Sequence, residues 1–549
     1  MRWIVGATKP RMFVWAGVIV IIAACFVAYI PAIKSGFIWD DDVYVTNDPL
    51  LTAPDGLYRI WLTTESPSQY FPLTYTTFWV EHKLWGFNPA GYHAVNVAIH
   101  CANALLLWLI LRRLSIPGAW FASAIFALHP VQVESVAWVT ERKNVLMLFF
   151  SLLSVLCWME FALFQRSGRK TYVGSLLLYA LALFSKTTAC TLPLALVLIL
   201  WFKRVPLTAK RWLQVAPFAA MALAMGHIAR GWEMVHQGTS TINLGLTSDG
   251  KILLAGRALW FYLWKLFWPT NLTFSYPRWN IDLTQSWQYA WPAAFLLVLY
   301  LAYRWRNQLG IGPFAALLFF VLTLIPMLGF FSLYTFVYTF VADHYQYAAC
   351  IGPIALVAAG GERILRRSGT NGKIVIFSAA GILLLTLGVL TWRQSRVYVN
   401  EKVLWQDTFK KNPDSWLARG ELMDRLIEQG KLEDAKNHAE QRIKLGAYTK
   451  TINPHIYASF YFNLATILEA QNKLDEAVNC YQQSLEIYND YALAHYRLGE
   501  VLYKQGNYTM AMTHLRRVME IKKNEKNNRL VEACIRMMNS IEDKKQYHN

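Results

Sequence analysis

Paired cysteines are absent from this sequence. Its seven cysteines form no Cys-x-x-Cys motif and show no regular spacing, and five of them lie in or beside apolar segments: Cys25, Cys101, Cys157, Cys190 and Cys350. A disulfide framework or a zinc site needs cysteines in pairs at defined spacings. The sequence therefore predicts neither.

Charged residues are scarce as well, at 16% of the 549 residues against 55% hydrophobic residues. This composition excludes an ordinary soluble enzyme and indicates a protein with many membrane spans. The net charge of +18 could indicate nucleic-acid binding, but the basic residues lie in short clusters between apolar segments, such as Arg112-Arg113 and Lys203-Arg204. That pattern is typical of cytoplasmic loops, so we expect no nucleic acid among the partners.

Long apolar runs are abundant up to Trp392. Residues 11–30 can cross a bilayer, which takes roughly 20 helical residues, and we interpret them as a retained signal anchor. The runs and their basic flanks predict about eleven spans in an inner (plasma) membrane, with a cytoplasmic N-terminus and everything after Trp392 outside. Residues 252–268 are short and interrupted by Arg257 and Lys265, so we interpret them as interfacial or re-entrant.

Three adjacent acids follow the first span. Asp40, Asp41 and Asp42 begin an outward loop of about residues 33–91, at the mouth of a hydrophobic bundle. Carboxylates in that position are costly to desolvate, which favours a functional site. The alternative is a solvated loop that simply ends a helix, and these residues alone do not choose between the two.

The predicted topology collects further polar groups on the same side of the membrane. Glu134 lies deep in an apolar span, beyond His129-Pro130, where a carboxylate without a function would be costly. The other members come from neighbouring connections of the chain: Glu141, Arg142, Lys143, Lys186, Asn271, Tyr276, Arg278, Asp343, His344 and Tyr345. Acids and bases that converge on one rim indicate a site more than a solvated surface.

These residue types suit group transfer from a lipid-linked phosphate. An Asp can take the proton from an acceptor hydroxyl that attacks a sugar C1. Arg and Lys can neutralise the phosphate that leaves. Plainer alternatives remain open: Lys186 as a snorkelling helix-end residue, Arg142 and Lys143 as solvated turn residues, and His344 as a helix-end residue.

The last part of the chain, residues 396–549, is charged and periodic. Leu464-Ala465 and Ala477 recur 34 residues later as Leu498-Gly499 and Ala511, and this is the tetratricopeptide period. Repeats near 416–449, 458–491 and 492–525, with a terminal helix, predict an α-solenoid that binds peptide or protein. We divide the chain into a membrane domain (1–395) and this repeat domain (396–549).

Several stretches, in order, resemble one family: FIWDDDVYVTNDP, GYHAVNVAIHCANALLLWLILRRL, FALHPVQVESVAWVTERKNVL, LFSKTTACTLPL, FWPTNLTFSYP and VADHYQYAACIG. With the repeats, they are similar to the transmembrane and tetratricopeptide repeat-containing proteins. These are GT-C-type glycosyltransferases whose animal members are protein O-mannosyltransferases that use dolichyl-phosphate mannose. The resemblance implies an all-α membrane helix bundle of GT-C type followed by the solenoid.

The resemblance also implies roles for single residues. Asp40 or Asp41 stands at the family's catalytic Asp and Glu134 at its second acidic position. Arg142-Lys143 occupies the family's basic turn, and Ser185-Lys186 its Ser-Lys pair. The implied phosphate-binding set is Arg142, Lys143, Lys186, His344 and Arg278, and the implied remaining substrate-site set is Asp343, Tyr345, Tyr276 and His129.

One departure from the family concerns Asp343-His344-Tyr345, where relatives commonly carry Arg in the middle position. A titratable group there puts phosphate binding in doubt. The simple membrane composition and the lack of targeting features suggest a bacterial relative, whose donor would be undecaprenyl-phosphate-linked and whose sugar need not be mannose. No cofactor is implied; a divalent ion between Asp40 or Asp41 and Glu134 stays open, because some GT-C enzymes use one.

The sequence therefore predicts an inverting glycosyltransferase that moves a sugar from a polyprenyl-phosphate carrier to a hydroxyl acceptor on the periplasmic side. The expected partners are the lipid-linked donor, the bilayer and a protein on the repeats. Two alternatives remain. The first is a non-catalytic scaffold that gathers envelope proteins. The second is a transporter of lipid-linked sugars, which would need more polar residues at the bundle midplane than are visible.

Overall fold

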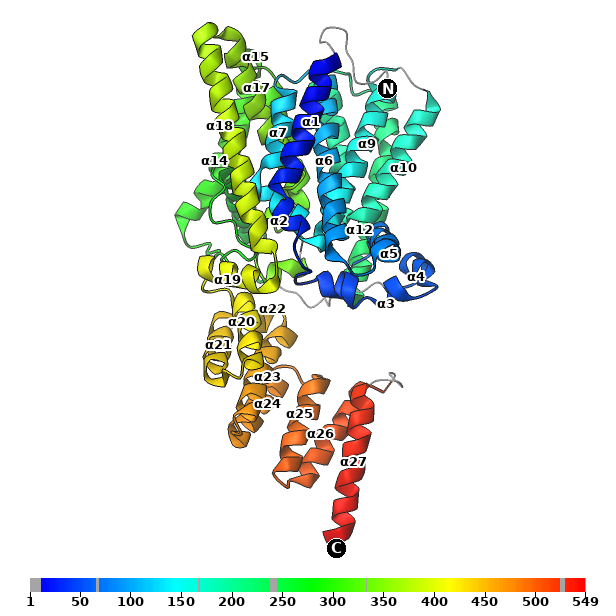
Figure 1. The fold of residues 1–549 in the computed structure, drawn as a ribbon, viewed down its shortest axis with the longest axis vertical. Coiled ribbons are helices and arrows are strands. Elements are labelled where there is room, and N and C mark those ends of the chain that lie inside the picture. The colour runs from blue at the N-terminus through cyan, green and yellow to red at the C-terminus, as the bar shows by residue number, and fades with distance from the viewer. Residues whose placement is uncertain are drawn as a thin grey trace.

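The computed structural model describes residues 11–65, 69–165, 168–236, 244–331, 333–523 and 529–548. These residues form helices, turns and loops with no strand among them, which confirms the predicted all-α class. Figure 1 shows a bundle that contains the N-terminal part of the chain and a narrower stack of helix pairs that leads away from it to the C-terminus.

Four described helices are long and apolar enough to cross a membrane, by length and composition. Pro89–Arg113 (α6) and Val139–Ala162 (mostly α9, Arg142–Ala162) have 50% and 72% of their apolar windows buried, so they form the centre of the bundle. The other two helices have only 17% and 11% of their apolar windows buried, so they expose apolar side chains. They are Ala209–Met234 (in α12, Ala209–His236) and Thr370–Tyr398 (mostly α18, Thr370–Ser395). The predicted number of spans stays a prediction.

The other bundle helices are shorter. They are α1 (Arg11–Ala28), α2 (Ile30–Ile33), α7 (Ala119–Leu128), α8 (Val133–Ala137), α10 (Arg169–Ser185), α11 (Leu192–Phe202), α13 (Ser248–Phe267), α14 (Ala290–Arg304), α15 (Arg306–Leu309), α16 (Gly312–Leu324) and α17 (Ile351–Arg367). Residues 252–268, expected to be interfacial or re-entrant, form most of α13, which packs against α14. Whether α13 lies at the interface stays a prediction.

The predicted apolar span that contains His129-Pro130 and Glu134 is not one continuous helix. α7 ends at Leu128, and His129 is extended with φ −78° and ψ 127°. A residue before proline avoids helical geometry, and Pro130 then starts a new 3-10 turn because its ring suits a first helical position. The chain restarts as α8, which places Glu134 in a helix of its own inside the bundle.

The first outward loop contains three short helices, α3 (Pro49–Thr52), α4 (Gly56–Leu62) and α5 (Pro72–Trp85). Tyr44, Phe71, Tyr75 and Phe78 pack together there in a small buried core with Tyr92 at the start of α6. The loop is therefore a folded cap at one end of the bundle, near the start of the repeats (Figure 1).

The repeat domain has the predicted helix pairs. They are α20 (Trp416–Glu428) with α21 (Leu432–Leu445), α23 (Pro454–Ala470) with α24 (Leu474–Ile487), and α25 (Ala492–Lys504) with α26 (Tyr508–Ile521), before α27 (Arg529–His548). A Cβ at Gly499 would lie 3.2 Å from Leu515, so the small residue permits the close approach of α25 and α26. Residues 446–453, the extra stretch between the first two repeats, hold α22 (Thr449–Ile452).

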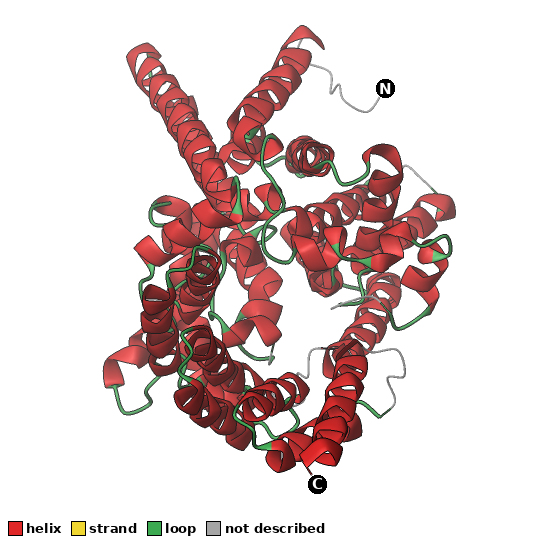
Figure 2. Cartoon of the chain, turned by 60° about the horizontal axis from the view of Figure 1, so that its bottom comes forward, coloured by secondary structure: helices red, strands yellow, loops and turns green. Residues whose placement is uncertain are grey.

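The start of the repeat domain packs directly on the bundle. α19 (Glu401–Lys411) begins just after α18, and its Trp405 belongs to the same buried core as the bundle helices. Asn412 donates a hydrogen bond to the Ser275 carbonyl (3.0 Å) and the Tyr448 hydroxyl donates to the Val337 carbonyl (3.0 Å). Figure 2, which brings the repeat end forward, shows helices joined by loops throughout the described part of the chain.

Candidate active site

Asp40 and Asp41, the two candidates for the catalytic acid, lie in different surroundings. Asp41 is fully buried, and Oδ1 accepts hydrogen bonds from the Thr140 backbone N–H (2.8 Å) and hydroxyl (2.6 Å). Its Oδ2 accepts from the Ile38 N–H at 2.9 Å. Burial raises the pKa of Asp41 to about 7, although these hydrogen bonds oppose the shift. Asp41 thus ties the first loop to the 3-10 turn before α9.

The Asp40 carboxylate is available to a substrate. It is partly exposed, and it makes no side-chain hydrogen bond within the described part of the chain. Desolvation raises the pKa of Asp40 to about 6, and the charge of the Lys143 ammonium opposes this shift. The Tyr334 and Tyr338 hydroxyls lie 2.7 Å apart, and the Asp40 charge adds to burial in raising the pKa of both. Asp42, by contrast, is exposed and opens the π-helical turn Asp42–Thr46.

Two lysines meet at one carboxylate. Lys143 Nζ lies 3.1 Å from Glu141 Oε1, and Lys186 Nζ lies 3.2 Å from Glu141 Oε2. All three side chains are buried, and the Lys143 ammonium faces the Trp138 ring at 5.7 Å. We call Glu141, Lys143 and Lys186 the lysine cluster. Its excess of positive charge in a poorly hydrated place suits an anionic phosphate.

Arg142, although next in sequence, points elsewhere. It is fully buried and forms a two-point ion pair with Glu81 of α5, one contact being 3.1 Å. It also donates to the Asn96 side chain and to the Tyr92 carbonyl (2.9 Å) of α6. Each nitrogen of its guanidinium donates to a protein group, so a phosphate would have to displace Glu81. Arg142 holds α5 and α6 against α9.

Glu134 reaches the lysine cluster through His344. Glu134 Oε1 lies 3.0 Å from His344 Nδ1, and its Oε2 accepts from the His344 backbone N–H at 3.1 Å. His344 Nε2 lies 3.9 Å from Glu141 Oε1. Asn144 donates to the His344 carbonyl at 3.0 Å. The imidazole thus lies between two carboxylates, where the family's arginine would carry a fixed charge.

Four predicted site residues serve nearby contacts. The Tyr276 hydroxyl donates hydrogen bonds to the buried carboxylate of Asp343, at 3.0 and 3.1 Å from its two oxygens. Tyr345 donates to the Thr335 hydroxyl at 2.6 Å. His129 Nε2 lies 2.9 Å from the Leu266 carbonyl of α13.

Arg278 lies at the junction with the repeats. It donates to the Phe336 carbonyl, and its guanidinium lies 4.0 Å from the Phe340 ring centre and 4.5 Å from that of Tyr448. Neither Arg278 nor His129 contacts the lysine cluster in the described structure. Their geometry suits holding segments together rather than binding phosphate.

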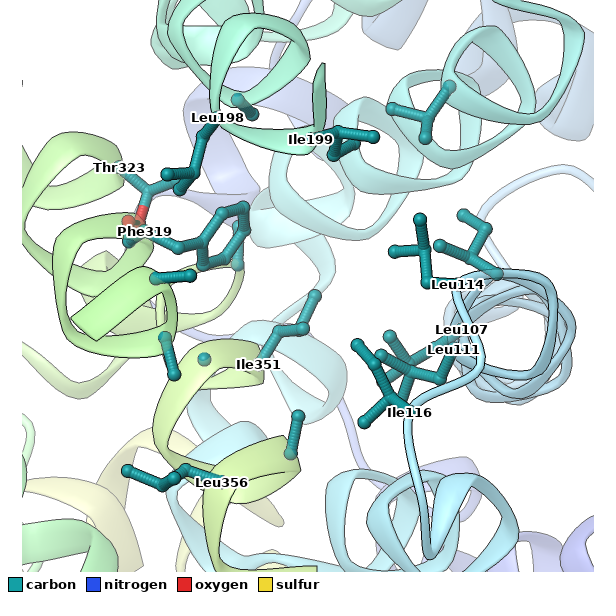
Figure 3. A pocket seen from close by; sticks show the side chains of 18 of the residues that line it. Leu107, Leu111, Leu114, Ile116, Leu198, Ile199, Phe319, Thr323, Ile351 and Leu356 are labelled. Carbon is teal, nitrogen blue, oxygen red and sulfur yellow. Dashed lines mark hydrogen bonds between the residues drawn. The ribbon is translucent and has the colours of Figure 1, made fainter. Parts of the chain in front are cut away.

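An apolar cavity of about 630 Å³ leads from the lysine cluster into the bundle. Helices α6, α9, α11, α16 and α17 line it, and Figure 3 shows Leu111, Leu198, Phe319 and Ile351 around it. Its lining extends along α17 from Ile351 to Arg363, a helical rise of roughly 18 Å. Where the cavity meets the lysine cluster, the lining residues are Asn144, Lys186, His344 and Tyr345.

A divalent metal does not fit these residues. Asp41 is committed to Thr140 and Ile38, and Glu134 to His344. No group of three or more His, Cys, Asp or Glu side chains in the described ranges is placed to hold a metal ion. The expected alternative of an ion between Asp40 or Asp41 and Glu134 therefore finds no support in the arrangement of this chain.

Sequence reasoning missed several members of this network. Thr140, Tyr334 and Tyr338 gave no local signal, because each acts through a contact with a distant segment. A carboxylate in an aromatic helix, as at Glu81, was the one available hint. His93, Asn96 and His100 of α6 hydrogen-bond to other segments of the chain, for example His100 Nδ1 to the Tyr347 hydroxyl at 2.7 Å.

Fold and site together define an all-helical membrane protein with a buried ionic site beneath a tetratricopeptide solenoid. Family models agree with both parts. Residues 69–229 match the dolichyl-phosphate-mannose-protein mannosyltransferase model, residues 465–506 the TPR repeat model, and residues 492–525 the tetratricopeptide repeat model.

Named relatives are of the same kind. The chain is 22% identical to the protein O-mannosyl-transferase Tmtc3 of Drosophila melanogaster over 91% of this chain and 67% of the relative. It is 23% identical to human TMTC2 over 74% of this chain and 60% of that protein, and 30% identical to Drosophila melanogaster Tmtc1 over 31% and 21%. The chain thus spans only part of these relatives. It is similar to the transmembrane and tetratricopeptide repeat-containing protein O-mannosyl-transferases, which supports the predicted glycosyltransferase class.

Among solved structures, a chain of the APC/C hetero-tetramer Cut9-Hcn1 matches 90% of this chain and 98% of its own length at 14% identity. The TM-score of 0.24 is too low to support a shared fold.

Proposed function

We propose that this chain is an inverting glycosyltransferase that moves a sugar from a polyprenyl-phosphate carrier to a protein hydroxyl. The observation that carries the proposal is the continuity of the apolar cavity with the lysine cluster. The cavity suits a polyprenyl tail, and Lys186, which belongs to both, lies where the tail's phosphate would end. Asp40 interacts electrostatically with Lys143, the other lysine of the cluster, whose charge opposes the rise in the pKa of Asp40.

The reaction is a single displacement. Asp40 takes the proton of the acceptor hydroxyl as its oxygen bonds to the sugar C1. The bond from C1 to the phosphate oxygen breaks, and the polyprenyl phosphate leaves with the electron pair. Lys143 and Lys186 stabilise its charge, since each ammonium has N–H donors beyond those facing Glu141. Attack opposite the leaving group inverts the configuration at C1.

Asp40 rather than Asp41 is the base in this proposal, because both Asp41 oxygens already accept hydrogen bonds. Glu134 positions His344 against the lysine cluster, and Arg142 positions α5 and α6. No metal takes part. The relatives' names, protein O-mannosyl-transferases, make dolichyl- or undecaprenyl-phosphate mannose the first donors to try.

We place the chain in the plasma membrane with several spans, the N-terminus cytoplasmic, and the site and repeat domain (396–549) outside. This topology is supported by the position of the first loop and the repeats at the same end of the bundle (Figure 1). The basic residues Arg366-Arg367 end α17 at the opposite end. A reporter fused after Trp392 should be active only outside the cytoplasm. A cytoplasmic signal there would overturn this topology.

The catalytic assignment is tested with purified full-length protein, a labelled donor and candidate protein acceptors. Sugar on the acceptor and free polyprenyl phosphate are both measured. Asp40→Asn should lower transfer about 10²–10⁴-fold, whereas Asp42→Asn, the same change on an exposed neighbour, should leave it intact. Equal activity of the two variants would contradict the role of Asp40. Tight binding of a protein by the repeats without turnover would instead support the scaffold alternative.

A further inference from the structure

The repeat domain contacts the backbone of the residue next to the proposed base. The Trp39 N–H donates a hydrogen bond to Glu401 Oε1 of α19 at 3.1 Å, across 362 positions of the chain. The other oxygen, Glu401 Oε2, lies 3.1 Å from Arg425 of α20, so the first repeat holds this carboxylate in place. Trp39 immediately precedes Asp40.

The Trp39 ring is held from the same side. Its ring centre lies 5.0 Å from that of Trp405 of α19, in an edge-to-face arrangement at 71°. It also lies 6.3 Å from Phe274 and 6.4 Å from Tyr338, and Phe274 itself lies 5.3 Å from Trp405. Three segments distant in sequence thus meet around one tryptophan, and the repeat domain provides the nearest of its aromatic neighbours.

The backbone of Trp39 needs such support. Its φ is +48°, in the left-handed region that bulky side chains rarely adopt, and the surrounding structure must hold it there. The turn is closed by hydrogen bonds from the Asp41 N–H to the Ile38 carbonyl (3.0 Å) and from the Asp42 N–H to the Trp39 carbonyl (3.2 Å). This turn sends Asp41 to Thr140 and leaves Asp40 beside Lys143.

We infer that Glu401 and Trp405 are positioning residues of the active site, so that α19, the helix that precedes the first repeat and is paired with it through Arg425, is a structural part of the transferase. They act through Trp39 by fixing the turn that presents the Asp40 carboxylate. This inference rests on the proposed function. It separates two roles within the solenoid: α19 and α20 serve the chemistry, and the later repeats are left for binding the acceptor.

The test compares variants of the full-length protein. Glu401→Ala removes the acceptor for the Trp39 N–H and should lower kcat at least about tenfold, because a small misplacement of a reacting group is costly. The KM values for donor and acceptor should stay within about twofold, since Glu401 touches neither in the proposed mechanism. Glu401→Gln keeps an oxygen at the same reach and should restore most of kcat.

Glu469→Ala is the matched control. It removes a glutamate of the second repeat that pairs with Lys504 and accepts from Tyr481, with no ion pair or hydrogen bond to the described residues of the first loop. Hydrogen exchange adds a readout independent of turnover. The amides of residues 38–46 should exchange faster in Glu401→Ala than in the wild type, and at the wild-type rate in Glu469→Ala. If Glu401→Ala accumulates too poorly to assay, Glu401→Asp, whose carboxylate is one methylene short, should show the same loss of kcat in milder form.

The outcomes separate the two proposals. A wild-type protein that transfers no sugar and releases no polyprenyl phosphate contradicts the proposed function. An active wild type with an unchanged kcat in Glu401→Ala overturns the positioning role alone. So does an equal loss in Glu469→Ala, or a Glu401→Gln variant as slow as Glu401→Ala.

Discussion

Ion pairs occur in both halves of the molecule, but in opposite settings. At the rim of the bundle, the side chains of Lys186 and Glu141 are 9% and 1% exposed. In the repeats, those of Lys504 and Glu469 are 54% and 12% exposed. Removing a charge from water costs several kcal/mol, whereas an exposed pair is worth little in either direction. The rim therefore carries costly charges that folding alone does not need.

The largest stability effect is expected at the most buried pair. Arg142→Ala leaves Glu81 uncompensated in the cap of the bundle, and should lower the free energy of unfolding by about 3–5 kcal/mol. Unfolding of the purified protein in detergent measures this loss. The double variant Arg142→Met with Glu81→Gln should recover part of it, because no unpaired charge remains. An Arg142→Ala protein as stable as the wild type would contradict the expected difference between buried ion pairs of the bundle and exposed ion pairs of the repeats.

The second effect concerns turnover. Lys186→Met keeps the apolar stem of the lysine beside the cavity and removes the ammonium. Loss of one such electrostatic contact typically costs about 10²–10³-fold in kcat, so we expect a fall of that size in sugar transfer. Lys203→Met, at the other end of α11, is the control and should retain activity. Comparable rates in the two variants would count against phosphate binding by the lysine cluster.

The pH dependence should be smaller, with activity and stability moving in opposite directions. The base must be ionised, so the transfer rate should fall about tenfold per unit as the pH drops below about 6, the raised pKa of Asp40. Both acids are easier to protonate folded than unfolded, since burial raises their pKa values to about 6 and about 7. The stability that their protonated forms contribute is fully present below about pH 4 and is lost as the pH rises through 6 to 7.

The transfer rate and the thermal unfolding temperature, each measured across this pH range, check the expected changes in activity and in stability. The Asp42→Asn variant should keep the shape of both profiles and move them slightly to lower pH, because the Asp42 charge contributes to the raised pKa of Asp40. A transfer rate that stays constant down to pH 4 would contradict Asp40 as the titrating base.

The smallest effect is expected in the repeats. Lys504→Ala removes its exposed pair with Glu469 and should change the free energy of unfolding by about 0.2–1 kcal/mol at most, without changing sugar transfer. A loss above about 2 kcal/mol would show that exposure does not explain the difference between the two regions.

Much of the fold could be predicted from the sequence because its signals are local. Apolar runs and the 34-residue period each lie within one segment, and α6, α9 and the repeat pairs appear where expected. Part of the rim could be predicted: Glu134, Lys186 and His344 lie close to Glu141, whereas Arg278 lies at the junction with the repeats. The partners could not. From the sequence, Arg142 was predicted to bind phosphate, but in the structure its guanidinium forms an ion pair with Glu81, 61 positions away. The break at His129 needed only the rule for residues before proline.

Glu141 stands between two ammonium groups before any substrate arrives. In the proposed reaction, a departing lipid phosphate would not leave unpaired cations behind, because the Glu141 carboxylate already pairs with both ammonium groups. This carboxylate would compete with the phosphate for the lysines, shorten the residence time of the product and favour repeated turnover over tight binding.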